Sequence, residues 1–149
     1  MPRLINISEA VSLGLHTMVL LATDTERRFS NPEIAETLDV SGHHLAKVMQ
    51  RLVRAGLVDS VSGPRGGFLL ATPAQEIGLL RIYEAIEGTL ADEGCLLRKS
   101  TCDGRNCVLG EVLHSLHEQL RDYLSNTTLA GLAEGSPFHK MLRTTEDDS

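Results

Sequence analysis

The chain has 149 residues, with three cysteines, no tryptophan and a formal net charge of -6, and a length of this order suits one ordinary domain with an appendage. No apolar run approaches the roughly 18 residues of a membrane span, and residues 1–6 lack the regions of a secretory signal, so we expect a cytoplasmic protein without membrane contact. The negative charge argues against nonspecific coating of nucleic acid, although a locally basic helix can still read DNA.

The first predicted element is a helix over residues 7–22. Its apolar residues recur every three or four positions, which is the spacing of one helix face: Ile7, Val11, Leu15, Met18 and Ala22. Glu9, Ser12 and His16 fall on a polar stripe of the same helix.

Two short helices joined by a tight turn are predicted next, after a charged stretch at residues 23–29. Ser30 supplies a cap and Pro32 suits the first turn of a helix over residues 32–38. Asp39-Val40-Ser41 interrupts that helix, and Ser41 can cap a second one over residues 41–55. Gly56 suits the left-handed position that follows a helix. This order predicts a helix-turn-helix.

A small hairpin follows directly. Residues 57–61 and 68–70 have the composition of strands, and they flank Ser62-Gly63-Pro64-Arg65-Gly66-Gly67, whose glycines permit positive φ and whose proline fixes a bend. We interpret this hairpin as the wing of a winged helix-turn-helix.

The C-terminal part contains a helix that ends near Gly88, a loop rich in small and charged residues, and then a long helix. The long helix carries a heptad-like seam, which is typical of a helix that pairs with a partner: Leu109, Leu113, Leu116, Leu120 and Tyr123. A short helix is expected over residues 127–133, and the polar end of the chain is expected to be disordered.

The predicted recognition helix is basic although the chain as a whole is acidic. It carries no acidic residue, and it offers side chains that can bond to base edges and phosphates: Ser41, His43, His44, Lys47, Gln50, Arg51 and Arg54. Arg65 lies at the tip of the predicted wing, from which it can reach a minor groove or a flanking phosphate. The alternative is a solvated helix beside an ordinary turn. Because helix, turn, helix and wing occur in order, we favour binding to double-stranded DNA.

Cys95, Cys102 and Cys107 fall within one loop, which excludes a framework of paired disulfides. Three thiolates are soft ligands that suit an iron-sulfur cluster, and they leave one position for another ligand. We therefore favour a cluster as cofactor. A thiol switch that forms a disulfide, a structural zinc site and three free cysteines remain the alternatives.

Two segments together with the cysteines resemble the Rrf2 family of transcription regulators, which includes sensors of iron-sulfur clusters and of nitric oxide. The segments are LAKVM at residues 45–49 and AGLVDSVSGPRGGFLL at residues 55–70, and the likeness runs from about residue 3 to residue 132. The resemblance implies a homodimer in which the cysteine loop of one subunit lies near the first helix of the other.

The resemblance also implies that a residue other than cysteine supplies the fourth ligand. Cluster-sensing members have a histidine three residues after the last cysteine, whereas this chain has Gly110 there. Nitric-oxide sensors have a carboxylate in the first helix, and Glu9 occupies the matching place. Either a 2Fe–2S or a 4Fe–4S cluster is compatible with the cysteine spacing, which departs from the usual pattern of the family.

The predicted fold is mainly α with a small β wing. Residues 1–88 form the winged helix-turn-helix, residues 89–106 the cysteine-bearing sensor loop, residues 107–134 the dimerisation helix and a short C-terminal helix, and residues 135–149 a disordered tail. We expect a homodimeric repressor that binds a roughly palindromic operator and senses redox state, cluster status or nitric oxide. A cluster-free thiol regulator is the alternative, and a metal-binding electron carrier or enzyme is less favoured because no catalytic constellation is present.

Overall fold

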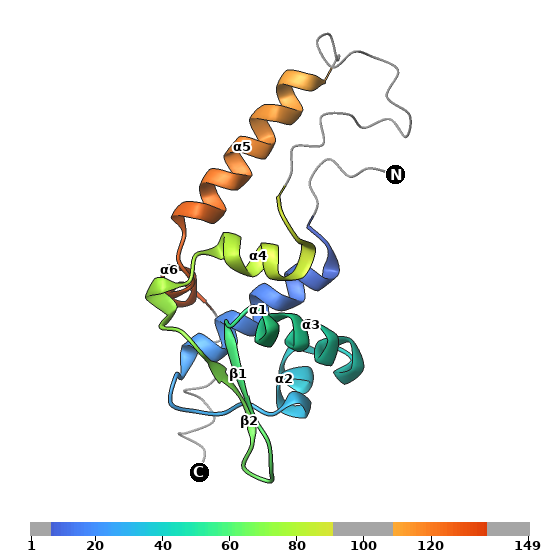
Figure 1. Cartoon of the computed structure of the whole chain (residues 1–149), viewed down its shortest axis with the longest axis vertical. Coiled ribbons are helices and arrows are strands. Elements are labelled where there is room, and N and C mark those ends of the chain that lie inside the picture. Colours follow the sequence, from blue (N-terminus) through green and yellow to red (C-terminus); the bar gives the residue numbers. More distant parts are fainter. Residues whose placement is uncertain (1–6, 91–108, 137–149) are drawn as a thin grey trace.

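The computed structural model describes residues 7–90 and 109–136 (Figure 1). The three cysteines, most of the predicted sensor loop and all but the first two residues of the predicted disordered tail lie outside the described residues. The elements in chain order are α1 (Glu9–Thr23), α2 (Asn31–Leu38), α3 (Gly42–Arg54), β1 (Val58–Val61), β2 (Gly67–Leu70), the 3-10 helix η1 (Ala74–Glu76), α4 (Leu79–Glu87), α5 (Gly110–Asn126) and α6 (Leu129–Glu134). The predicted class, mainly α with a two-stranded wing, is confirmed.

Hydroxyl side chains cap the first helices at positions that the sequence indicates. The Oγ atoms of Ser8, Ser30 and Ser41 accept hydrogen bonds from backbone N–H groups in the first turns of α1, α2 and α3, respectively. Each bond satisfies a donor that has no partner within the helix. α2 ends at Leu38, and its C-cap Asp39, whose φ of 52° is left-handed, turns the chain toward α3.

Helix α1 lies at the centre of the fold and is covered on more than one face. It contacts α3, α4, α6 and β2, so Leu13, Thr17 and Leu20 are buried in addition to Val11 and Met18 of the predicted face. Ile7 is exposed, because the helix begins two residues later. A single amphipathic stripe therefore underestimates how much of this helix is buried.

The wing is an antiparallel hairpin in which Val58 pairs with Leu70 and Val61 with Gly67. A third segment joins it, since the backbone of Phe29 exchanges hydrogen bonds of 3.0 Å and 2.7 Å with that of Phe68. Gly67 has a φ of 146°, and a Cβ atom there would lie 2.6 Å from the Phe29 carbonyl oxygen. Only glycine fits this close approach of two backbones.

Helix α5 projects away from the body, and its C-terminal end leads into α6, which lies in the body (Figure 1). The Leu79 N–H donates to the Thr127 carbonyl at 3.0 Å, and the Leu129 N–H donates to the Ile77 carbonyl at 2.8 Å. Leu129 and Ala133 are then buried in the same core as α1. The short C-terminal helix is thus part of the core that supports the helix-turn-helix.

Candidate nucleic-acid interface

Helix α3 has one fully buried face. Four apolar side chains hold it against the core, each at most 2% exposed: Leu45, Val48, Met49 and Leu52. These positions recur with the period of a helix, so the opposite face is fixed in orientation as well. The packing therefore decides which side chains α3 presents to a ligand.

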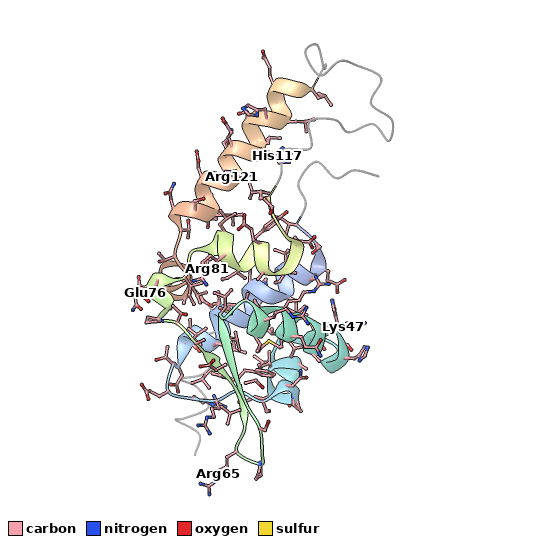
Figure 2. All side chains as sticks on the ribbon, viewed as in Figure 1. Lys47, Arg65, Glu76, Arg81, His117 and Arg121 are labelled. Atoms are coloured by element: carbon pink, nitrogen blue, oxygen red, sulfur yellow. The ribbon has the colours of Figure 1, made fainter. Side chains whose placement is uncertain are left out.

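The outer face of α3 consists of His43, Lys47, Gln50 and Arg54, spaced by four, three and four residues, and all four are exposed. Figure 2 shows Lys47 pointing away from the body of the molecule. Lysine and arginine suit phosphate, and glutamine and histidine can bond to base edges. Three of the predicted DNA-contacting residues, His43, Lys47 and Gln50, therefore lie on one surface together with Arg54.

Ser41 and His44 lie at the N-terminus of α3. The Ser41 Oγ accepts a hydrogen bond of 3.4 Å from the His44 backbone N–H, and Ser41 itself is exposed. The His44 side chain is half-buried and lies beside the outer face. Ser41 thus has a structural task as a cap, in addition to any contact with DNA.

Arg51 is placed differently from the other predicted residues. It lies on the flank of α3 next to α4, and its Nη1 donates a hydrogen bond of 2.6 Å to the carbonyl oxygen of Ile86. Its guanidinium therefore has a partner within the chain, which sequence analysis did not anticipate. The contact joins residues 35 positions apart, so no local pattern could reveal it.

The tip of the wing presents Arg65 at the far end of the molecule (Figure 2). Gly63, Pro64, Arg65 and Gly66 form a tight turn, closed by a 2.9 Å hydrogen bond from the Gly66 N–H to the Gly63 carbonyl. The proline and the positive φ of Gly63 suit this bend. Arg28 Nη1 lies 3.4 Å from the Arg65 carbonyl oxygen. It adds a second cation near the tip, at a position that the sequence marked only as charged.

A groove of about 430 Å³ separates α3 from the wing. It is lined by Asn31, Ala46, Met49, Gln50, Val53, Arg54, Ser60 and Phe68. Gln50 and Arg54 of the outer face stand at its rim, so the helix and the wing present one continuous surface.

Of the four predicted cluster ligands, Glu9 lies within the described residues. Glu9 is exposed in the first turn of α1. Its neighbour Ser8 donates a hydrogen bond to the Glu87 carboxylate at the end of α4, four residues before residue 91. Within residues 7–90 and 109–136, no three His, Cys, Asp or Glu side chains are grouped to hold a metal ion.

The predicted seam of α5 divides into two faces. Of the predicted seam, Leu113 is buried and Leu120 packs against the core, and Leu124, which the predicted seam omits, is buried as well. The remaining apolar residues form a strip, spaced by three, four and seven residues, that is partly or largely exposed. We call it the apolar strip of α5: Leu109, Val112, Leu116 and Tyr123. Val112 enters this strip although the predicted seam omits it.

In the described part of the chain, none of the helices combines the length and apolar character that crossing a membrane requires. The relatives with which the chain shares sequence and structure are named as regulators of transcription.

The sequence matches the Rrf2 family model, described as an iron-dependent transcriptional regulator, over residues 7–135. It is 34% identical over 129 residues to the HTH-type transcriptional regulator BadM of Rhodopseudomonas palustris, which covers 85% of this chain and 77% of BadM. The structure is similar to CymR, the global cysteine regulator of B. subtilis, with a TM-score of 0.74, 27% identity and coverage of 89% of this chain and 98% of CymR. The structure is also similar to IscR of T. potens, with a TM-score of 0.68, 26% identity and coverage of 97% of this chain and 91% of IscR. The protein therefore belongs to the Rrf2 family of DNA-binding, winged-helix regulators of transcription.

Proposed function

We propose that the protein is a dimeric repressor that binds a palindromic operator and whose affinity for DNA responds to chemistry at Cys95, Cys102 and Cys107. The observation that carries this proposal is the outer face of α3, where the packing of four buried side chains presents a basic and amide surface in an acidic protein. The wing lies beside this face, and its tip adds Arg65 to the proposed DNA-binding surface.

In this proposal α3 enters the major groove. His43 and Gln50 bond to base edges, Lys47 and Arg54 neutralise phosphates, and Arg65 reaches the flanking minor groove or backbone. Ser41 and His44, at the N-terminus of the helix, lie where a phosphate is favoured by the helix dipole. The guanidinium of Arg51 is hydrogen-bonded to the Ile86 carbonyl of α4.

The DNA-binding proposal is tested by selecting an operator from a random duplex library and measuring affinity across a range of salt concentrations. Lys47→Ala removes one phosphate contact, so the slope of log K against log salt falls by about one unit. Arg81→Ala is the matched control, because Arg81 is an exposed cation on the opposite side of the body (Figure 2). An unchanged slope in Lys47→Ala, or an equal loss in Arg81→Ala, contradicts this assignment.

The apolar strip of α5 supports the dimer. A second copy can cover it by a two-fold contact, and the two copies of α3 then address two related half-sites, which explains a palindromic operator. Sedimentation at micromolar concentration tests this step. A monomer that binds a single half-site with full affinity contradicts it.

An iron-sulfur cluster is the favoured sensor. Thiolates are the ligands such clusters prefer, and a cluster would supply reactivity toward oxidants and nitric oxide. Cys95, Cys102 and Cys107 would hold it, and Glu9 would reach across the dimer to supply the fourth ligand to the cysteines of the other subunit. A carboxylate is a poor match for cluster iron, so a bond from Glu9 would be weaker than those from the three thiolates. The likeness to IscR and the iron-dependent family description support this choice.

A cluster-free thiol regulator is the second candidate. Gly110 stands where a ligating histidine is expected from the family, and the structure is also similar to CymR, which was solved from Staphylococcus aureus in an oxidized form. In this alternative, oxidation of the cysteines changes DNA affinity without any metal.

Absorption spectra of anaerobically purified protein, with iron and sulfide analysis, separate the two candidates. A brown protein whose colour is lost in any of Cys95→Ser, Cys102→Ser and Cys107→Ser supports the cluster, and a colourless protein that still binds DNA supports the thiol regulator. Glu9→Ala is expected to retain some cluster, with a changed spectrum and a shorter lifetime in air. Glu26→Ala, at an exposed carboxylate in the turn that follows α1, is the control. Equal decay in Glu9→Ala and wild type removes Glu9 from the ligand set.

A further inference from the structure

Three helices meet at the C-terminal end of α4. The side chain of Ile86 is buried there between α1 and α3, so close to Gly14 that a Cβ atom on that glycine would overlap the Ile86 Cδ1. The same Cβ position lies 3.6 Å from Val48 Cγ1 of α3. A shift of Ile86 therefore cannot be absorbed by empty space, since well-packed neighbours must move with it.

Two polar contacts fasten the same end of α4. Arg51 Nη1 of α3 donates to the Ile86 carbonyl at 2.6 Å, and Ser8 at the start of α1 donates to the Glu87 carboxylate. The carbonyls in the last turn of a helix lack partners within the helix and carry the negative end of its dipole. A guanidinium is thus a favourable partner for this carbonyl, through a charge-assisted hydrogen bond.

In the sequence, this junction comes shortly before the cysteines, since Leu90 precedes Cys95 by five residues. Gly88 turns the backbone with a φ of 84°, and Leu90 is buried. Arg121 of α5 donates to the Leu90 carbonyl. Two arginines therefore hold the carbonyls on either side of the turn at Gly88, one from α3 and the other from α5.

We propose that Arg51 is a positioning residue that fixes α3 on the end of α4, and that it transmits displacements of this end to the recognition helix instead of contacting DNA. The transmission half of this proposal rests on the proposed function, since it requires that chemistry at the cysteines changes DNA affinity. The positioning half does not. A coupling element needs two arrangements that both sites bias, and a single charge-assisted bond across a tight junction provides a contact that can be made or broken.

The test compares Arg51→Ala, Arg51→Lys and Lys47→Ala, after thermal unfolding has shown that each variant is folded. Lys47→Ala is the matched control, because it removes one positive charge from the outer face of the same helix. The first measurement is hydrogen exchange at the end of α4, where the Gly88 N–H bonds to the Glu84 carbonyl. Arg51→Ala is expected to accelerate exchange there, Arg51→Lys to restore part of the protection, and Lys47→Ala to leave it unchanged.

The second measurement is the salt dependence of DNA binding. Arg51→Ala is expected to weaken binding by a similar factor at every salt concentration, roughly two- to thirtyfold, with an unchanged slope. Lys47→Ala lowers the slope by about one unit. Normal exchange at the end of α4 combined with a lower slope in Arg51→Ala overturns the proposal and makes Arg51 a phosphate contact.

The third measurement is the ratio of DNA affinities between two states of the cysteines. For a cluster regulator these are the cluster-loaded and the apo protein, and for a thiol regulator they are the oxidised and the reduced protein. In Arg51→Ala this ratio is expected to fall toward one, while Lys47→Ala keeps the wild-type ratio. A wild-type ratio in Arg51→Ala refutes transmission through Arg51. If the wild-type protein itself shows no difference between its states, the proposed sensing function has failed, and the first two measurements still decide whether Arg51 is a positioning residue.

Discussion

Helices α3 and α5 are both amphipathic, yet the fold treats their apolar residues differently. The inner face of α3 is buried completely by its own chain. In α5, Leu113 and Leu124 are buried, while Val112 and Tyr123 are each 55% exposed. Sequence periodicity alone marks both helices as having one apolar side, and only the surrounding elements distinguish them.

The difference shows what each helix offers to another molecule. What α3 leaves outside is basic and polar, which water solvates well and DNA binds. What α5 leaves outside is apolar area, which is stabilised when another surface covers it. The first is a surface for reading DNA, and the second we interpret as a surface for assembly.

The largest effect is expected from a charge placed in the apolar strip of α5. Val112→Asp is expected to abolish the dimer at micromolar concentration, because an unpaired carboxylate is costly to bury. Operator affinity should fall with it, since the two half-sites are no longer bound together. Sedimentation and DNA-binding titrations measure both effects. Ser115→Asp, on the exposed polar side of α5, introduces the same charge and should leave the dimer intact; a monomer in both variants would argue against a specific strip.

Substitutions on the inner face of α3 are expected to destabilise the folded monomer. Leu45 is fully buried, so Leu45→Ala should lower the free energy of unfolding by about 2–5 kcal/mol. Urea unfolding in the Val112→Asp background separates this effect from assembly. In the same background Leu109→Ala should change the midpoint little, because Leu109 is exposed. Similar losses at the two positions would remove the distinction between the helices.

A smaller effect on stability, together with a loss of DNA affinity, is expected from a substitution in the wing. Gly67→Ala is expected to cost about 1–3 kcal/mol, because alanine is strained at a φ of 146° and its Cβ would press on the Phe29 carbonyl. The hairpin should then shift relative to α3, so DNA affinity falls even at temperatures where the protein stays folded. Ser62→Ala, at an exposed site in the same hairpin, is the control. Unchanged stability and affinity in Gly67→Ala would mean that the Phe29 pairing does not position the wing.

The smallest expected effect is that of Arg65→Ala. The side chain is exposed at the tip and supports no packing, so stability should stay within about 0.5 kcal/mol of wild type. Operator affinity is expected to drop, and a footprint should shorten at its flanks. A footprint with full flanks would assign the contact to another cation near the tip, of which Arg28 is the nearest described example.

Local signals made the helix-turn-helix and the wing predictable from sequence. Ser41 caps α3 and Gly56 follows it with a positive φ, as expected for a helix end. Gly63 and Pro64 likewise determine the tight turn at the tip of the hairpin. These features depend on backbone preferences within single turns, which a sequence states directly.

The features that sequence missed all join distant residues. The Phe29 pairing with the wing, the bond from Arg51 to Ile86 and the cover that α6 places over α1 depend on tertiary arrangement. Periodicity predicted one buried stripe on α1, but elements from both ends of the described chain surround this helix. The division of the α5 seam has the same cause, since its own body covers only part of the apolar surface.

The late return of α6 has a consequence for synthesis. A nascent chain contains α1, α2, α3 and the wing well before Leu129 and Ala133 leave the ribosome, and until then part of the core beside α1 stays uncovered. Domains tend to fold as units during synthesis, and exposed apolar surface invites aggregation meanwhile. Because the cysteines and α5 precede α6, a polypeptide cut short before α6 lacks a complete DNA-binding core. Every chain that completes this core has therefore already made the segment that carries its cysteines.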